Sequence, residues 1–238
     1  MSSNSSLARH PARMAPVAIA LLVSSAAVTA QQPKKALPKP AYWNSPQPYE
    51  VRGEENGRLM KMFFSCVYGS SPSEIDAYLK SSDISGALPA KSVKLEQVTK
   101  RCGNRMGAAT MQQLHARIPG AVYRSFMAEQ AYLAKQSTPA VLPAGAIEFL
   151  RQAPKADGLP LVHALVSTAD CLSFRDTRGA DALLRTVPGS KEEQVAARAL
   201  VPALSQCIAA DEKFSMTAQT IRSFAADGLW ARYAQTEH

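Results

Sequence analysis

The spacing of the four cysteines constrains this chain more than any other feature. Cys66 and Cys102 stand 36 positions apart, and so do Cys171 and Cys207, so one shift of 105 residues superimposes the two pairs. The same shift aligns further identical residues: Gly53 with Gly158, Asp76-Ala77 with Asp181-Ala182, Leu79 with Leu184, Leu95 with Leu200, Met111 with Met216, and Arg117 with Arg222. Self-similarity at a fixed shift is typical of a repeated structural unit. The sequence therefore predicts an internal duplication.

The same spacing predicts two structural disulfides. Four cysteines allow three pairings, and we expect Cys66–Cys102 and Cys171–Cys207 because a duplicated unit keeps its own bond. On the chain-entropy model, closing a loop of this length stabilises a protein by roughly 4 kcal/mol. Redox couples and zinc sites, the functional alternatives, place their cysteines only a few residues apart, and the sequence lacks that pattern. No cofactor or metal is expected.

The patterns around the cysteines predict helices. Ser71-Pro72-Ser73-Glu74 combines an N-cap, a proline at the first helical position and a carboxylate in the first turn. Asp176 occupies the matching cap position in the second copy, and Ser190-Lys191-Glu192-Glu193 is a capping box that we expect to open a helix running to Cys207. Apolar residues at three- and four-residue steps predict the last helix of each copy: Met111, Leu114, Ile118, Val122 and Phe126, with Met216, Ile221, Phe224 and Trp230 as the counterpart. No stretch alternates with period two. We expect an all-α fold with a duplicated helical unit of about four helices per copy, each copy with one disulfide.

The chain divides into five predicted segments: a signal peptide (1–30), a proline-rich leader (31–52), helical repeat 1 (53–137), a connector (138–157) and helical repeat 2 (158–238). The first segment combines Arg9 and Arg13 with an apolar run, and it ends in a small-x-small cleavage site near Ala30. A short uncleaved anchor is the alternative, but a bilayer span needs roughly 20 apolar residues, and this run drifts into Ser, Thr and Ala. We expect a periplasmic or secreted protein with no transmembrane segment after signal removal.

The charge is positive and unevenly distributed, with 27 Lys and Arg against 19 Asp and Glu. Basic residues cluster in the first half: Lys91, Lys94, Lys100, Arg101 and Arg105. Such a cluster can bind an anionic component of the cell envelope. The alternative is that these residues form an ordinary solvated helix face. Nothing in the sequence indicates a nucleic-acid partner.

Polar residues that recur in both copies predict two ion pairs. Asp76 and Arg117 reappear in frame as Asp181 and Arg222, so we expect one Asp–Arg pair within each copy, held by charges about 4 Å apart or less. The alternative is that the four residues are independent surface positions.

No known catalytic motif occurs in the sequence. An active site assembled from distant residues could use His163, Asp170 and Arg175. His163 and Asp170 are seven positions apart on one predicted helix, which places them about 10 Å apart along its axis, too far for a direct hydrogen bond. The sequence leaves open whether the protein is an enzyme, and a non-catalytic protein is the favoured interpretation.

The second half resembles a group of exported alphaproteobacterial proteins with no assigned activity. The residues that carry the resemblance are Cys171, Ala182-Leu183-Leu184-Arg185-Thr186, Pro188-Gly189-Ser190-x-Glu192-Glu193, Leu200-Val201-Pro202-Ala203-Leu204, Cys207, and Ile221-Arg222 to Leu229-Trp230. Ser223 and Asp227 depart from the glycine and glutamate of that group. The resemblance implies an exported helical protein and indicates no chemistry.

These patterns together favour an exported helical protein with a non-catalytic binding or envelope-associated role. We expect a groove or patch between the two copies, by analogy with other duplicated helical proteins. An enzyme and an anionic-surface binder are the alternatives.

Overall fold

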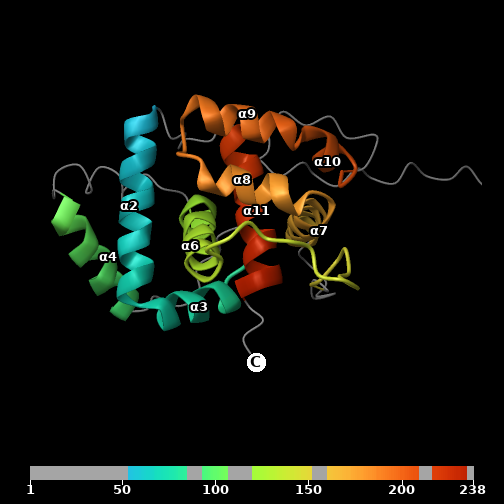
Figure 1. Cartoon of the computed structure of the whole chain (residues 1–238). Coiled ribbons are helices and arrows are strands. Elements are labelled where there is room, and N and C mark those ends of the chain that lie inside the picture. The colour runs from blue at the N-terminus through green and yellow to red at the C-terminus, as the bar shows by residue number, and fades with distance from the viewer. Residues whose placement is uncertain (1–52, 85–92, 107–119, 152–159, 209–215, 235–238) are drawn as a thin grey trace, which may run out of the picture. The chain divides into compact units, whose positions relative to one another are not determined.

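The computed structural model describes residues 53–84, 93–106, 120–151, 160–208 and 216–234, and these residues form helices and connecting loops without a strand (Figure 1). The helices are α2 (Glu54–Ser70), α3 (Pro72–Ser81), α4 (Val93–Met106), α6 (Gly120–Lys135), α7 (Pro160–Arg175), α8 (Thr177–Arg185), α9 (Lys191–Ala199), α10 (Val201–Ser205) and α11 (Ala218–Leu229), which continues as a π-helical turn, η1 (Trp230–Ala234). The all-α class predicted from the sequence is confirmed. The predicted signal peptide and leader lie outside the described residues, as do Lys91 and Arg117.

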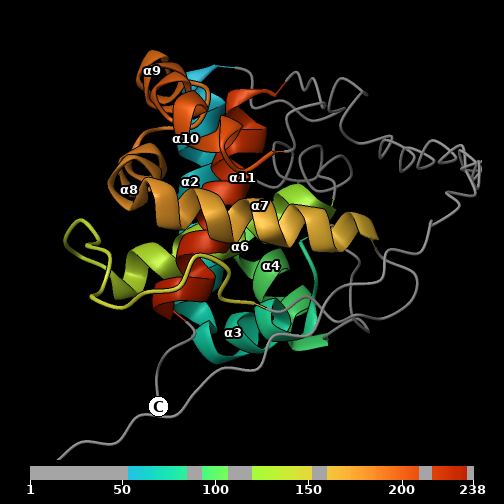
Figure 2. The same ribbon diagram turned by 90° about the vertical axis from the view of Figure 1, so that its right-hand side faces the viewer.

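Helix α11 is the element around which the others pack. It contacts α6, α7, α8 and α9, and Figure 2 shows α7 crossing in front of it. Small residues make these contacts close: a Cβ added at Gly228 would collide with the backbone carbonyl of Ala169 on α7. Phe224, Ala225 and Leu229 are fully buried. Because α11 is enclosed by helices of both halves, its polar side chains must find partners inside the protein.

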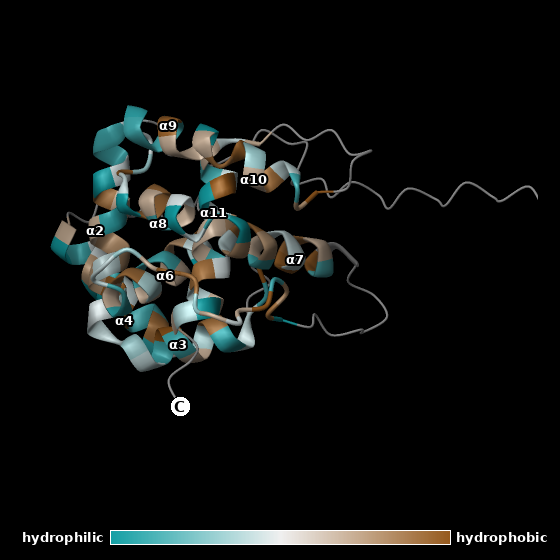
Figure 3. Ribbon diagram, turned by 45° about the vertical axis from the view of Figure 1, so that its right-hand side comes forward, coloured by the Kyte–Doolittle hydropathy of each residue, from teal (hydrophilic) through white to brown (hydrophobic). Residues whose placement is uncertain are grey.

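Aromatic side chains form the core of the first half. The rings of Phe64 on α2 and Phe126 on α6 stack with centroids 4.9 Å apart, and Phe63 and Tyr123 meet Phe64 edge-on. Helices α2, α3, α4 and α6 enclose this cluster. In Figure 3 apolar and polar positions are interspersed along each helix, as expected of amphipathic helices.

Each half contains one disulfide. Cys66 on α2 is bonded to Cys102 on α4, with the two Cα atoms 5.9 Å apart. Cys171 on α7 is bonded to Cys207, just after α10, with a Cα–Cα distance of 5.7 Å. These are the two pairs that the equal spacing predicts. Each bond joins the first helix of its half to a later one and leaves no cysteine free.

Two of the three predicted helix caps are present. The Asp176 side chain accepts a hydrogen bond from the Gly179 N–H at 2.8 Å, and the Ser190 side chain accepts one from the Glu193 N–H at 3.1 Å. Ser71 stands at the N-cap of α3 without a side-chain hydrogen bond to the helix.

The single helix expected from Ser190 to Cys207 is wrong. The chain turns at Leu200, so that α9 ends at Ala199 and α10 starts at Val201. Pro202 explains the break, because proline lacks an N–H group and its ring collides with the carbonyl four residues earlier.

Candidate functional site

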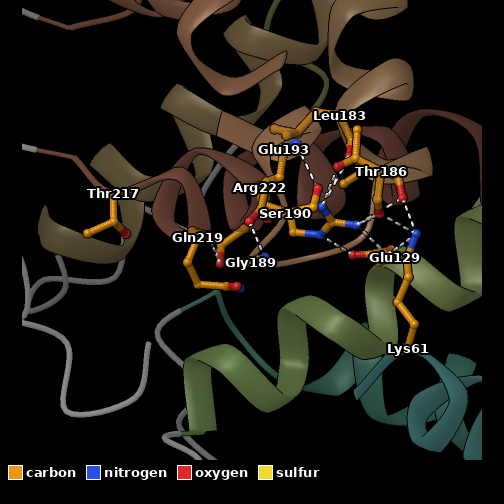
Figure 4. Close-up of polar contacts among 12 residues, drawn as sticks. Lys61, Glu129, Leu183, Thr186, Gly189, Ser190, Glu193, Thr217, Gln219 and Arg222 are labelled. Atoms are coloured by element: carbon orange, nitrogen blue, oxygen red, sulfur yellow. Dashed lines mark hydrogen bonds and ion pairs between the residues drawn. The ribbon is translucent and has the colours of Figure 1, made fainter. Parts of the chain in front are cut away.

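Arg222 lies at the centre of a buried set of charged side chains. Its Nε and Nη2 atoms donate to the two carboxylate oxygens of Glu129 at 2.7 and 2.9 Å, and its Nη1 donates to Glu193 at 3.1 Å. The Nζ atom of Lys61 lies 3.3 Å from Glu129. We call these four residues the Arg222 cluster, and its formal charges cancel (Figure 4).

Arg222 also binds the C-terminal end of α8. Its guanidinium donates to the backbone carbonyls of Leu183, Leu184 and Thr186 at 3.0, 2.9 and 3.0 Å. Lys61 donates to two of the same carbonyls, those of Leu184 and Thr186, at 2.6 and 2.8 Å. The last carbonyls of a helix lack intrahelical partners and form the negative end of its dipole. Arg222 and Lys61 therefore bind the C-terminal end of α8 in addition to their carboxylate partners.

Burial and charge have opposing effects on the pKa values in this cluster. Burial lowers the pKa of Lys61, and the attraction of Glu129 offsets only part of that effect. Burial also acts to lower the pKa of Arg222, but Glu129 and Glu193 raise it above its ordinary value. Arg222 is therefore charged at every pH at which the protein is folded.

A second charged set lies at the other end of the contact between α6 and α11. Arg124 donates to Asp227, and Arg151 donates to the second Asp227 oxygen at 2.6 Å. Arg151 also donates from Nε, Nη2 and its backbone N–H to Asp170 at 2.9, 2.7 and 2.8 Å. These four residues are the Arg124 cluster, which is also formally neutral. Burial would raise the pKa of Asp227, but Arg124 and Arg151 lower it below its ordinary value.

The two clusters are reciprocal. Arg124 and Glu129 lie five positions apart on α6, as do Arg222 and Asp227 on α11, and each arginine pairs with the carboxylate of the other helix. Arg124 also donates to the carbonyl of Leu79 near the end of α3, at 3.2 Å, as Arg222 does to Leu184 near the end of α8. Each half thus contributes an arginine that caps a helix of its own half and binds a carboxylate of the other.

The sequence contains a signal for this arrangement that the cysteine spacing does not show. Arg124-Ser125-Phe126-Met127-Ala128-Glu129 matches Arg222-Ser223-Phe224-Ala225-Ala226-Asp227 at a shift of 98 residues rather than 105. The shift that aligns the two halves is therefore seven residues smaller for the last helices than for the cysteines. In this second frame the counterpart of Arg222 is Arg124, whereas the cysteine frame aligns it with Arg117.

The predicted Asp181–Arg222 ion pair is wrong. Asp181 pairs instead with Arg185 at 2.8 Å and accepts a hydrogen bond from the Tyr132 hydroxyl at 2.6 Å. Arg222 points to the carboxylates of Glu129 and Glu193, which satisfy its charge. Of the other predicted pair, Asp76 bonds to Lys135 at 3.1 Å, and Arg117 lies outside the described residues.

The structure does not bring His163, Asp170 and Arg175 together as a site. His163 is exposed on α7, and its nearest polar partner is the Ser167 hydroxyl at 3.5 Å. Asp170 is buried and bound to Arg151, whereas Arg175 pairs with Glu148 at 2.7 Å. Asp170 and Arg175 are thus each bound to a different partner, and the three side chains do not meet in one site.

The basic residues of the first half lie on the outer face of α4. Lys100, Arg101 and Arg105 are exposed, and Lys94, also exposed, pairs with Glu74 at 2.9 Å. The opposite face of α4 buries Val98 and Cys102, the latter in the disulfide to α2.

A cavity of about 560 Å³ lies between α9, α10 and the start of α11. Its lining consists of Gly53, Gly189, Glu193, Gln194, Ala197, Arg198, Val201, Met216, Thr217, Ala218, Gln219 and Ile221. We call it the α9–α11 cavity. Its volume falls within the range of about 300–1,000 Å³ that is usual for small-molecule sites. A site between the two halves was expected, but among the lining residues that the structure describes, only Gly53 comes from the first half.

Among the described lining residues, Gln219 is the one polar side chain that is buried without a hydrogen-bond partner. It exposes 6% of its surface, and neither its amide oxygen nor its amide nitrogen makes a hydrogen bond. In Figure 4 its side chain stands apart from the bonded groups around Arg222. Behind it lies a second cavity of about 20 Å³ between α6 and α11, enough for one water molecule.

The described residues hold no group of three or more His, Cys, Asp or Glu side chains placed to bind a metal ion. None of the described helices has both the length and the apolar character that a membrane span requires. Comparison of the chain with protein-family models, with curated proteins and with solved structures finds no match. The arrangement of the residues themselves is therefore the basis for a functional proposal.

Proposed function

We propose that this chain is an exported, non-catalytic binding protein whose binding site is the α9–α11 cavity. The observation that carries this proposal is the cavity itself, whose volume of about 560 Å³ and mixed apolar and polar lining are those of a small-molecule site.

The two charged clusters support binding over catalysis. Each buried carboxylate in them forms an ion pair with at least one arginine, so each already has a structural partner. The clusters instead fix α6, α8 and α11 relative to one another. Such a rigid frame raises the affinity of a binding site because less conformational entropy is lost when the ligand binds.

The proposal includes a duplicated helical unit, and three observations support it. At the cysteine shift of 105 residues, the end of α2 at Ser70 falls on the end of α7 at Arg175, and the start of α3 at Pro72 falls on the start of α8 at Thr177. The disulfides have equal sequence separations. The reciprocal ion pairs of Arg124 and Arg222 relate the last helices of the two halves at a shift of 98 residues.

The proposed compartment is the periplasm or the exterior of the cell. The basic, apolar and small-residue regions of the first thirty residues are typical of a cleavable signal peptide, and disulfides persist in oxidising compartments. The resemblance of the second half to exported alphaproteobacterial proteins agrees with this compartment and stays a prediction.

A cavity-filling substitution tests the binding role. The full chain would be produced with export, purified without reductant and examined by native mass spectrometry for a bound small molecule. Val201→Trp places an indole in the cavity wall, and Val195→Trp is a matched control because Val195 is exposed on α9 but does not line the cavity. We expect a bound mass in the wild type and in Val195→Trp and its loss in Val201→Trp. A bound mass that survives in Val201→Trp would contradict the proposal.

The outer face of α4 supports a second candidate function, binding to an anionic surface. Lys100, Arg101 and Arg105 are exposed and form no ion pair with any described residue. If they bind an anionic membrane, the Arg101→Glu/Arg105→Glu variant loses sedimentation with vesicles that contain phosphatidylglycerol. Arg178→Glu/Lys191→Glu, the control with the same change in charge elsewhere, keeps it. Sedimentation that does not decrease as salt is raised rules this candidate out.

A further inference from the structure

The start of α2 lies at the edge of the α9–α11 cavity. Gly53, the residue before α2, belongs to the lining, and Figures 1 and 2 both show this end of α2 near α9. Close packing holds it there, because a Cβ at Gly57 would collide with the backbone carbonyl of Pro188, the neighbour of the lining residue Gly189. The chain that precedes Gly53 is therefore joined to the wall of the cavity by a peptide bond.

The space beside Gly53 is open. A Cβ added to this glycine would meet no atom within 4 Å, and the cavity has a volume of about 560 Å³. One water molecule takes up about 30 Å³ in the liquid, so one or two ordered waters do not fill the cavity. It has room for side chains of a segment that is attached at Gly53.

The lining combines apolar side chains with exposed polar ones. Gln194 and Arg198 are exposed and lie one turn apart on α9, and Arg198 forms no ion pair with any described residue. Glu193 does not balance this charge, since its two oxygens accept from Arg222 at 3.1 Å and from the Gly189 N–H at 2.6 Å. The apolar side chains that are not fully buried are Val201, Met216 and Ala218. A segment that suits this lining carries apolar groups and one negative charge.

The last residues of the leader match this description. Tyr49 and Val51 stand two positions apart with Glu50 between them, and Glu50 is the one acidic residue of the leader. Alternate side chains of an extended chain point to opposite sides. Tyr49 and Val51 are thus able to face the apolar wall while Glu50 faces Arg198.

This part of the leader is also within reach of the cavity. A chain spans at most about 3.6 Å per residue, so the Cα atom of Tyr49 lies within about 14 Å of that of Gly53. Pro46 and Pro48 directly precede this stretch. Because proline fixes φ, the segment loses less conformational entropy when it docks.

We propose that the α9–α11 cavity receives the chain's own leader, residues 49–51. Tyr49 and Val51 lie against Val201 and Met216, and Glu50 pairs with Arg198. Since the segment is covalently attached, its effective concentration at the cavity is on the order of millimolar. A ligand of the cavity must then displace the leader, which makes the leader an internal competitor. This last consequence rests on the binding role proposed above.

Methionine oxidation tests the contact on the exported full chain, in protein that native mass spectrometry shows to be free of a bound molecule. Met216 lines the cavity, whereas Met62 exposes 61% of its surface outside it and serves as an internal reference. Tyr49→Ala is expected to raise the rate at which peroxide oxidises Met216, relative to Met62, by about threefold or more, because a covered thioether reacts slowly. Tyr42→Ala, the matched control, leaves this rate unchanged. Equal Met216 rates in the wild type and in Tyr49→Ala overturn the inference.

A photocrosslinker identifies what Tyr49 touches. The variant Tyr49→p-benzoylphenylalanine is expected to form a crosslink within one chain to the peptide that carries Val201 or Met216, and Tyr42→p-benzoylphenylalanine is not. Peptide mass mapping after illumination gives the result. Crosslinks that reach only residues outside the lining, or that join two chains, show that the cavity does not receive the chain's own leader.

A charge exchange tests the predicted pair. Glu50→Arg and Arg198→Glu are each expected to raise the relative oxidation rate of Met216, and the double variant Glu50→Arg/Arg198→Glu to bring it back toward the wild-type rate. Glu50→Arg/Arg178→Glu, with the second change on α8 outside the cavity, does not bring it back. A double variant that reacts as fast as the single variants contradicts the proposed orientation of the leader.

The outcomes separate this inference from the binding role. If the leader contact is found but no bound mass is ever observed, the leader fills the cavity and the binding role fails. If a bound mass is present and is lost in Val201→Trp, while Tyr49→Ala changes nothing, the cavity binds a ligand and the leader inference alone is wrong. If both hold, Tyr49→Ala raises the fraction of chains that carry the bound mass.

Discussion

The Arg222 and Arg124 clusters are built on similar short sequences, but their arginines bind different numbers of partners. Arg222 binds two carboxylates and three backbone carbonyls, whereas Arg124 binds one carboxylate, one carbonyl and the Ser82 hydroxyl at 3.0 Å. The second carboxylate of the Arg124 cluster, Asp170, belongs to Arg151 instead. The comparison shows that similar residues on α6 and α11 form the contact between these two helices, while other charged neighbours determine how many partners each arginine has.

The largest expected effect is at Arg222. Arg222→Ala leaves Glu129 and Glu193 buried with Lys61 as their one remaining cation, and breaking a buried ion pair in this way costs roughly 3–5 kcal/mol. Arg222→Lys is expected to recover little, because one ammonium group cannot replace five donors in a planar fork. Urea unfolding followed by circular dichroism measures both variants. A loss below about 1 kcal/mol for Arg222→Ala would show that the cluster is not a major source of stability.

The contact between the halves also depends on a glycine. A Cβ at Gly57 on α2 would overlap the backbone carbonyl of Pro188 before α9, whereas one at Gly69 on the same helix meets nothing within 4 Å. We expect Gly57→Ala to destabilise by about 2–4 kcal/mol, since the backbone must move, and Gly69→Ala to be neutral or slightly stabilising. Thermal unfolding of the two variants gives the comparison directly. Similar midpoints would mean that α2 and the turn before α9 shift apart easily.

Arg124→Ala is expected to cost less than Arg222→Ala, about 2–3 kcal/mol. Asp227 keeps Arg151 as a partner at 2.6 Å, and only one carbonyl, that of Leu79, loses its donor. The double variant Arg124→Ala/Arg222→Ala sharpens the comparison. Because the two clusters share the α6–α11 contact, the two costs are expected to be non-additive in a double-mutant cycle. Strict additivity would indicate two independent interactions.

The smallest expected effect is on the pH dependence of stability. Since the folded state lowers the pKa of Asp227 below its ordinary value, its contribution is fully present above about pH 4 and is lost as the pH falls through the folded-state value. Asp227→Asn starts from a lower stability but loses less of it in acid. Urea midpoints measured between pH 6 and the acid limit test this. An unchanged acid slope in Asp227→Asn would place the acid-sensitive group elsewhere.

Features set by local sequence were predictable here, and features set by contacts between distant segments were not. The cysteine spacing predicted both bonds, and the caps of Asp176 and Ser190 depend on neighbours within a few positions. The partners of Arg222 come from α6, α8 and α9, and no periodicity in the sequence relates those segments. The cysteine frame aligns Arg222 with Arg117, although Arg124 is the residue that makes the matching contacts.

The α9–α11 cavity was not predictable for a different reason. The cavity is lined in part by Gly53 and Gly189, which have no side chain, and by Ala197, which has only a methyl group. None of these stands out in the sequence, because glycine and alanine are common residues. The break at Pro202, by contrast, could have been predicted from the residue alone.

The arrangement of the disulfides has a consequence for how the chain acquires them. Both bonds pair cysteines that follow one another in the sequence, Cys66 with Cys102 and then Cys171 with Cys207. A polypeptide that meets an oxidant as it emerges, N-terminus first, has both partners of the first bond exposed before Cys171 appears. Simple oxidation in order of emergence thus yields the native pairing, and no reshuffling by an isomerase is required.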